Sequence, residues 1–81
     1  MKAKIFVTLK NGILDPQGRA VQQSLHTLGF TTVEEVRIGK FMELDLHEKD
    51  ATSAENQIKS MCDQLLANTV IEDYQYEILD R

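Results

Sequence analysis

The residues of this sequence that could support covalent or metal chemistry are few and far apart. The single cysteine, Cys62, lies within a predicted helix beside an apolar stripe, where a thiol usually behaves as a small hydrophobic side chain. His26 and His47 share no metal-ligand spacing with Cys62 or with each other. The cysteine therefore predicts core packing, and the histidines predict no zinc site.

The stretch from residue 11 to residue 19 is the best candidate for an anion site. Asn11 and Arg19 are the amide and basic residues that an acylphosphatase-like hydrolase would need, an interpretation that rests on fold analogy. Asp15 opposes phosphate binding, because its carboxylate places negative charge at a helix start, and Pro16 removes an N–H donor. We expect a capped helix entry here and no catalytic residue.

Several carboxylates lie on predicted strands or at their ends. Paired acids can exchange protons with a substrate when they are enclosed. A solvated outer face explains them better, because charged side chains are seldom buried without a partner. These residues are Glu34, Glu35, Glu43, Asp45, Glu72, Asp73 and Glu77.

Length and charge restrict the classes of partner. The 81 residues predict a single domain, residues 1–81, with one modest core that oligomerisation would supplement. A net charge of -4 disfavours binding to nucleic acid and to anionic lipid. No apolar run approaches the roughly 20 residues of a membrane span, and no signal peptide is visible, so we expect a cytoplasmic protein.

The charges are also divided unevenly along the chain. Residues 1–40 hold six basic and three acidic side chains, whereas residues 41–81 hold three basic and ten acidic ones. Such a dipolar arrangement suits docking to another protein.

Hydrophobic periodicity predicts a strand over residues 2–10 and a helix over about 16–28. Asp15 and Pro16 are typical of a helix start, and Gly29 is typical of a helix end. Alternation returns over residues 33–47, where Gly39-Lys40 fits a two-residue hairpin turn. One long strand with a bulge at Gly39 is the alternative, and the sequence leaves both open.

The second half of the chain predicts a helix over about 53–66 and a strand over 70–79. Thr52 and Glu55 form a candidate capping box for the helix, which carries an apolar stripe from Ala54 to Leu65. The order βαββαβ predicts an α+β, ferredoxin-like fold, with two helices on one face of an antiparallel sheet.

Phe6 and Phe41 fall on the polar phase of their strands, so they should point away from the helices. An aromatic side chain buries on the order of 150 to 250 Å² when it is covered. We therefore expect a dimer interface at Phe6 and Phe41, formed through the open face of the sheet, in a homodimer or a higher oligomer.

Several stretches of the chain are distinctive when they are taken together: Leu14–Gly18 with Ala20-Val21, Leu28–Phe30, Val36–Leu44, Met61-Cys62 and Leu65–Tyr74. Together they resemble the PurS family, the small subunit of phosphoribosylformylglycinamidine synthase. The similarity covers nearly the whole chain in order, and the segment from about 48 to 60 is the least distinctive. Thr69 departs from the pattern, because some members carry proline there.

The resemblance implies a non-catalytic subunit of a ligase of purine biosynthesis. In that enzyme, formylglycinamide ribonucleotide (FGAR) is converted to the amidine (FGAM) with ATP and glutamine. The chemistry is divided between a glutaminase subunit, PurQ, and a synthetase subunit, PurL, which would also use the Mg and ATP. This chain would hold no cofactor, and as a dimer it would bridge PurQ and PurL and support ammonia transfer.

The motif residues expected to be most exposed are the predicted partner contacts. Three have competing structural roles: Asp15 as a helix cap, Asn68 as a helix stop, and Arg37 as a cross-strand partner of a carboxylate. The predicted partner interface comprises Asp15, Gln17, Arg19, Arg37, Lys40, Asn68, Glu72 and Asp73. The alternative function is a dimeric regulatory domain of the same fold that senses a small molecule, a reading that composition leaves open.

Overall fold

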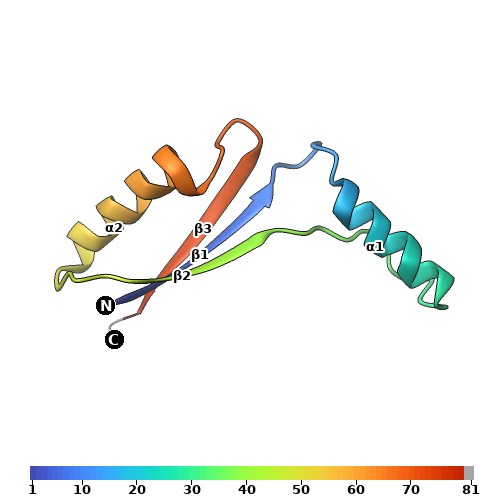
Figure 1. Ribbon diagram of the computed structural model, residues 1–81, viewed down its shortest axis with the longest axis horizontal. Coiled ribbons are helices and arrows are strands. Elements are labelled where there is room, and N and C mark those ends of the chain that lie inside the picture. The colour runs from blue at the N-terminus through green and yellow to red at the C-terminus, as the bar shows by residue number, and fades with distance from the viewer. Residues whose placement is uncertain (80–81) are drawn as a thin grey trace.

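The computed structural model describes residues 1–79, which form a three-stranded sheet, two α-helices and one short π-helical turn (Figure 1). The elements follow in the order β1 (Lys2–Leu9), α1 (Pro16–Thr27), β2 (Lys40–Asp45), α2 (Ala51–Met61), η1 (Cys62–Leu66) and β3 (Glu72–Leu79). The π-helical turn continues α2 without a break, so the two act as one rod. No helix in the described part of the chain is long and apolar enough to cross a membrane.

The sheet is antiparallel, with β1 between β2 and β3. Phe6 stands opposite Phe41 on β2 and opposite Gln75 on β3, which fixes the register on both sides. Alternate residues of β1 point to opposite faces, and Ala3, Ile5 and Val7 are buried. The period-2 pattern thus places an apolar row on one face.

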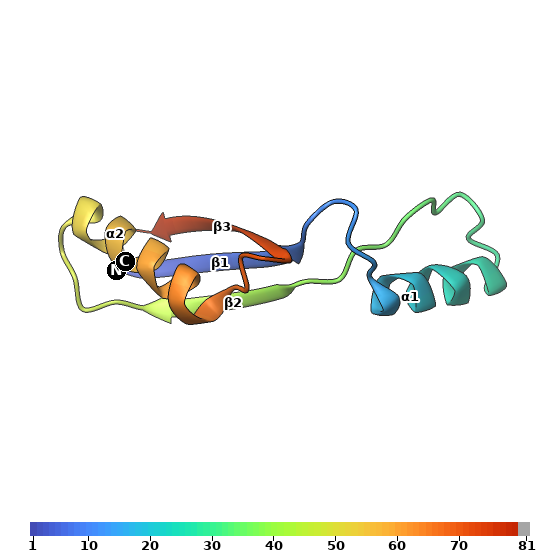
Figure 2. The same ribbon diagram turned by 90° about the horizontal axis from the view of Figure 1, so that it is seen from above.

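Helix α2 covers that apolar face (Figure 2). Ile58 of α2 and Cys62 of η1 are fully buried and form one core with Ile5 and Val7. The cysteine is therefore a core residue, as its position beside the apolar stripe predicts. Burial is the main cause that raises the pKa of its thiol, which keeps the thiol protonated and unreactive.

Two tyrosines of β3 tie the sheet to the helical rod. Tyr76 Oη donates to Glu55 Oε1 at 2.6 Å, and Tyr74 Oη donates to Asp63 at 3.3 Å. The hydrogen bond from Tyr76, followed by that from Lys59, lowers the pKa of Glu55. The carboxylate is therefore held in its charged form, between one hydroxyl and one ammonium group.

Helix α1 lies outside this body. It projects beyond the end of the sheet, and the chain returns to β2 along it through residues 28–39 (Figures 1 and 2). We call residues 16–39 the arm and the sheet with α2 and η1 the body. Asp15 caps α1 and Gly29 follows the helix with φ +102°, so both predicted ends are confirmed.

The fold class is confirmed as α+β and ferredoxin-like, but three details of the prediction are wrong. Residues 33–39 form no strand and no hairpin, so residues 1–79 contribute three strands in place of four. Only one of the two helices covers the sheet. The Thr52–Glu55 capping box is absent, because Asp50 caps α2 by accepting from the N–H groups of Thr52 and Ser53.

Candidate functional site

The arm and the body meet at a joint crossed by two segments, residues 10–15 and 36–39. Asp15 connects them: one carboxylate oxygen accepts from Gly18 N at 2.8 Å, and the other accepts from Ile38 N at 2.8 Å. The first bond caps α1, whereas the second spans 23 positions of sequence. Asp15 is only 9% exposed, so its hydrogen bonds lie inside the joint rather than on the surface.

The surroundings of Asp15 favour its charged form. The N–H of Ile38 has the largest effect and that of Gly18 the next largest, and both lower the pKa of the carboxyl. Partial burial raises the pKa, and the positive charge of Arg37 lowers it. The net shift is downward, so Asp15 is an anion held by fixed donors.

Arg37 connects the return segment, residues 28–39, to the loop after β1. Its guanidinium donates to the carbonyl oxygens of Leu9 and Lys10 and to Asn11 Oδ1. These contacts give the carbonyl oxygens at the end of β1 a charged donor, in addition to the N–H of Ile13 from which Lys10 O already accepts. The prediction that Arg37 pairs with a cross-strand carboxylate is wrong, and Asn11 is paired with Arg37 rather than with Arg19.

Two glycines allow the segments of the joint to approach closely. A Cβ on Gly18 would lie 2.0 Å from Val36 O, and a Cβ on Gly39 would lie 2.3 Å from Val7 O. Any side chain at either position would force backbone apart. Glycine is therefore required at both positions by contact rather than by backbone angle.

A cavity of about 220 Å³ opens beside the joint. It has apolar walls and a charged rim, a combination that suits an inserted side chain of another protein better than a reaction centre. Groups of three or more metal-ligating side chains are absent from residues 1–79. The lining residues are Val7, Leu9, Asp15, Pro16, Gln17, Ile38, Gly39, Lys40 and Glu72.

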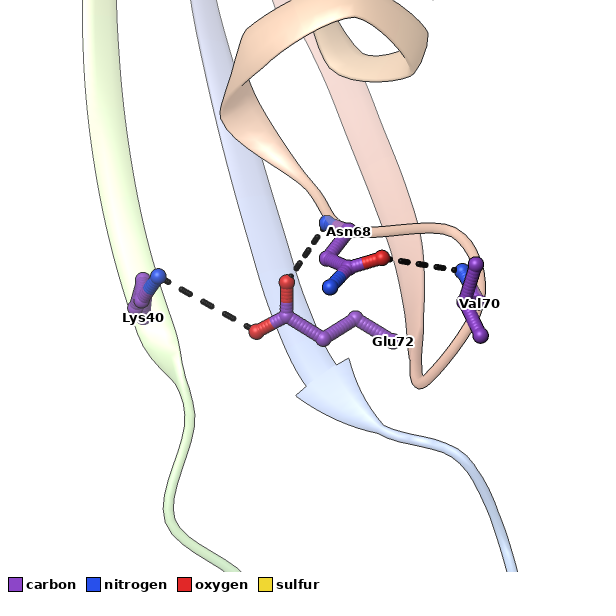
Figure 3. A network of polar contacts seen from close by, with 4 residues as sticks. All are labelled: Lys40, Asn68, Val70 and Glu72. Carbon is purple, nitrogen blue, oxygen red and sulfur yellow. Dashed lines mark hydrogen bonds and ion pairs between the residues drawn. The ribbon is translucent and has the colours of Figure 1, made fainter.

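One rim of the cavity is organised by the turn between η1 and β3 (Figure 3). Glu72 accepts from Asn68 N at 2.7 Å, and its second oxygen lies 4.0 Å from Lys40 Nζ on β2. The side chain of Asn68 accepts from Val70 N at 3.2 Å. Asn68 thus organises the turn that follows the helical rod, as predicted, and Glu72 braces it from β3.

The structure gathers six of the eight predicted contact residues around the joint. Asp15, Gln17, Lys40 and Glu72 line the cavity, while Arg37 and Asn68 adjoin it. The expected exposure is wrong for Asp15 and also for Glu72, whose side chain is 14% exposed, because both have internal partners.

The other two predicted residues lie elsewhere. Arg19 is exposed on α1, and Asp73 lies on the open face of the sheet, where it borders a hollow with Phe6 and Thr8. Phe6 and Phe41 also lie on this face, away from α2, as their register predicts, with ring centroids 5.1 Å apart. Phe41 is 52% exposed, so the pair is an uncovered apolar patch.

Sequence reasoning missed the residues that hold the arm together. Gln22 Nε2 donates to Glu34 O at 2.7 Å, and His26 Nε2 lies 2.6 Å from Val33 O. Both side chains come from the same flank of α1 as Gly18, at spacings of four residues. That spacing was a usable signal, whereas the partner carbonyls could not be read from residue types.

Comparison with known proteins assigns the family. The family model described as PurS: Phosphoribosylformylglycinamidine (FGAM) synthase matches residues 2–80. The PurS subunit of phosphoribosylformylglycinamidine synthase from Bacillus subtilis is 53% identical over 77 residues, which are 95% of this chain and 90% of that protein.

Solved structures agree with this assignment. A crystal form of B. subtilis PurS superposes with a TM-score of 0.83 at 54% identity, covering 94% of both chains. A chain in the structure of PurLQS from Thermotoga maritima superposes with a TM-score of 0.87 at 28% identity, covering 96% of this chain and 95% of that one. On these matches over nearly its whole length, this chain belongs to the PurS family of FGAM synthase.

Proposed function

We propose that this chain is the non-catalytic PurS subunit of a glutamine-dependent FGAM synthase. It bridges the glutaminase PurQ and the synthetase PurL and supports ammonia transfer during the ATP-dependent conversion of FGAR to FGAM, in the cytoplasm. The observation that carries the proposal is the match over 96% of the chain to a chain of the T. maritima PurLQS structure. ATP, Mg and glutamine belong to the partner subunits in this proposal.

The shape of the protomer supports a homodimer. Its Cα radius of gyration is 16.1 Å, whereas a compact domain of this length has about 12 Å. Its accessible surface is 6060 Å², whereas a compact monomer of its mass exposes about 4,900 Å². The excess of about 1,100 Å² exceeds the roughly 800 Å² that each partner buries in a standard interface.

The apolar residues of the arm indicate which surface the second copy covers. Val21, Leu25 and Leu28 share one face of α1, and Leu28 is 72% exposed. On the body, Met42 and Leu44 of β2 are only half buried at the edge of the core. The arm of one copy therefore fits against the sheet of the other, where a ferredoxin-like fold places its first helix.

The return segment, residues 28–39, also supports a dimer in which the two copies exchange their arms. β2 is an edge strand, and the chain continues from it toward the arm without reversing (Figure 1). Residues 33–39 have the alternating pattern of a strand but pair with no strand in the part of their own chain that the structure describes. Pairing with the β2 edge of a second copy would give each sheet its fourth strand. Exchange of identical elements in this way is a low-cost route to a dimer.

The remaining open surfaces are the proposed contacts with further subunits. Phe6 and Phe41, which the sequence predicts as a dimer interface, lie on the face that arm exchange leaves uncovered. In this proposal they remain an interface between copies, which would pair exchanged dimers into a higher oligomer. The charged rim of the joint, with Gln17, Lys40 and the adjoining Asn68, serves docking to the larger subunits. Arg19 and Asp73 belong to this proposed contact set as exposed charges.

Reconstitution tests the proposed function. This chain alone should show no glutaminase or ATPase activity, and mixing it with PurQ and PurL should restore glutamine-dependent formation of FGAM. Ammonium salts in place of glutamine provide the control, because they bypass the glutaminase. Full glutamine-dependent activity of PurQ and PurL without this chain would refute the bridging role, and clear thermal stabilisation of the chain by an amino acid would favour the sensing domain.

A further inference from the structure

We infer that the joint is a rigid elbow, in which Asp15 fixes the direction of the arm and thereby selects pairing with a second copy over folding back onto the same chain. This inference rests on the dimer in the proposed function. It assigns to Asp15 a positioning role that is separate from capping α1.

The two hydrogen bonds of Asp15 have different consequences. The bond from Gly18 N lies within the first turn of α1 and stabilises the helix wherever the helix points. The bond from Ile38 N connects the start of the arm to its end, next to β2. Two segments cross the joint, so joining them side by side removes the freedom to swing that a single linker would keep.

Three further contacts act in the same direction. Arg37 fastens the return segment to the carbonyl oxygens of Leu9 and Lys10 at the end of β1. Gly18 lets the first turn of α1 rest on Val36, which holds the two segments of the arm together, and Gly39 lets the return segment cross Val7 of β1 closely. The contacts of Arg37 and Gly39 join the arm to β1 and its end, so they are lost if the arm rotates against the body.

The consequence concerns the choice between two ways of covering the same sheet. A flexible joint would let α1 fold over its own β2 and give a closed monomer, which concentration cannot oppose at low protein levels. A fixed elbow holds the arm away from its own sheet and leaves it available to the other copy. Loosening the elbow should therefore convert dimers into compact monomers without melting α1.

The substitution Asp15→Asn separates the two roles. Asparagine is as good an N-cap as aspartate, so the bond from Gly18 can persist, but its NH₂ group cannot accept from Ile38 N. Asp50→Asn is the matched control, because Asp50 caps α2 through Thr52 and Ser53 and bridges no second segment. Sedimentation equilibrium gives the dimer Kd, and small-angle scattering gives the radius of gyration.

We expect Asp15→Asn to raise the dimer Kd at least about tenfold, with a smaller radius of gyration for its monomer, while Asp50→Asn changes the Kd less than about twofold. Equal Kd values for the two variants would overturn the inference. If Asp15→Asn does not fold, Gly18→Ala provides the second test and should also raise the dimer Kd, because its methyl group would lie 2.0 Å from Val36 O and 3.0 Å from Asp15 Cγ, while the carboxylate itself is retained.

Failure of the inference is distinguishable from failure of the proposed function. If the wild-type chain is an extended monomer that becomes compact in Asp15→Asn, the elbow stands and the dimer does not. If both variants form equally tight dimers and support FGAM synthesis with PurQ and PurL, the proposed function stands and the elbow is wrong.

Discussion

The body and the arm differ in how they are stabilised. The body buries Ile5, Val7, Ile58 and Cys62 completely, between one face of the sheet and the helical rod. In α1, Gly18 alone is buried, and the arm is held by polar contacts to the carbonyl oxygens of its return segment. The body therefore has a hydrophobic core of its own, whereas the arm does not.

This difference shows that the sequence contains two kinds of apolar surface. The apolar face of the body is buried within the same chain, whereas the apolar face of the arm is not. A helix of 12 residues is marginal in water when no apolar face is covered, so the proposed dimer would stabilise the arm. Mutations in the body should change the free energy of unfolding by an amount that does not depend on protein concentration. Mutations in the arm should instead change the dimer Kd. The following predictions test that distinction.

The largest effect is expected in the core of the body. Ile58→Ala should lower the free energy of unfolding by about 2 to 5 kcal/mol, because the residue is fully buried and a cavity remains. Urea unfolding at several protein concentrations measures the change. Leu65→Ala on the same rod is the control and should cost less than about 0.5 kcal/mol, because Leu65 is 82% exposed.

The next largest effect is expected on the apolar face of the arm. Val21→Asp should weaken the dimer by about 2 kcal/mol, or about thirtyfold in Kd, because it places a charge in the proposed interface. Gln23→Asp on the opposite side of α1 introduces the same charge and should leave the Kd nearly unchanged. Equal Kd values in sedimentation equilibrium would remove this face from the interface.

A smaller effect of unusual sign is expected at the joint. Replacing glycine by alanine inside a helix normally stabilises it by about 1 kcal/mol. Gly18→Ala should instead destabilise the protein by about 1 kcal/mol, because the new methyl group would lie 2.0 Å from Val36 O. Ser24→Ala in α1 is the control and should be neutral or stabilising. A gain in thermal stability for Gly18→Ala would show that Val36 can move away from the new methyl group at little cost, which would contradict this prediction.

The smallest effect is expected from acid. The pKa of Asp15 is lowered from its ordinary value of 3.8, so its stabilisation is complete above that pH and is lost as pH falls through the lower value. The dimer Kd should therefore rise below about pH 4. Glu48 and Glu55 in the body also have lowered pKa values, so Asp15→Asn serves as the reference. If the dimer Kd of the wild type and that of Asp15→Asn changed equally with pH, the acid effect would not come from Asp15.

The local rules predicted the body well. Alternation placed Ala3, Ile5 and Val7 on one face, and the helical stripe placed Ile58 against them, with Cys62 beside it. The predicted stripe also included Leu65, which is 82% exposed, so that part of the prediction is wrong. The start of α2 is another exception, because the predicted Thr52–Glu55 capping box is wrong and Asp50, two residues before Thr52, is the N-cap. Asp50 is selected in the structure, where Glu48 also accepts from the N–H groups of Lys49 and Asp50.

The course of the arm could not be predicted in the same way. A period of two in residues 33–39 predicts an extended backbone with one apolar face, but it does not identify the strand that will pair with it. Gly39-Lys40 satisfied the residue preference of a tight turn, yet Gly39 is used for close approach to Val7. Likewise, residue type did not reveal that Asp15 and Arg37 serve the interior of a joint, because both contact backbone atoms from distant positions.

In the proposed dimer, the arm of one copy covers the sheet of the other. The most direct test is an isotope-filtered NMR experiment on dimers mixed from labelled and unlabelled chains. Intermolecular contacts between the methyl groups of Leu25 and the partner's Leu44 are the predicted result. A compact monomer in which Leu25 contacts Leu44 of its own chain would contradict the claim.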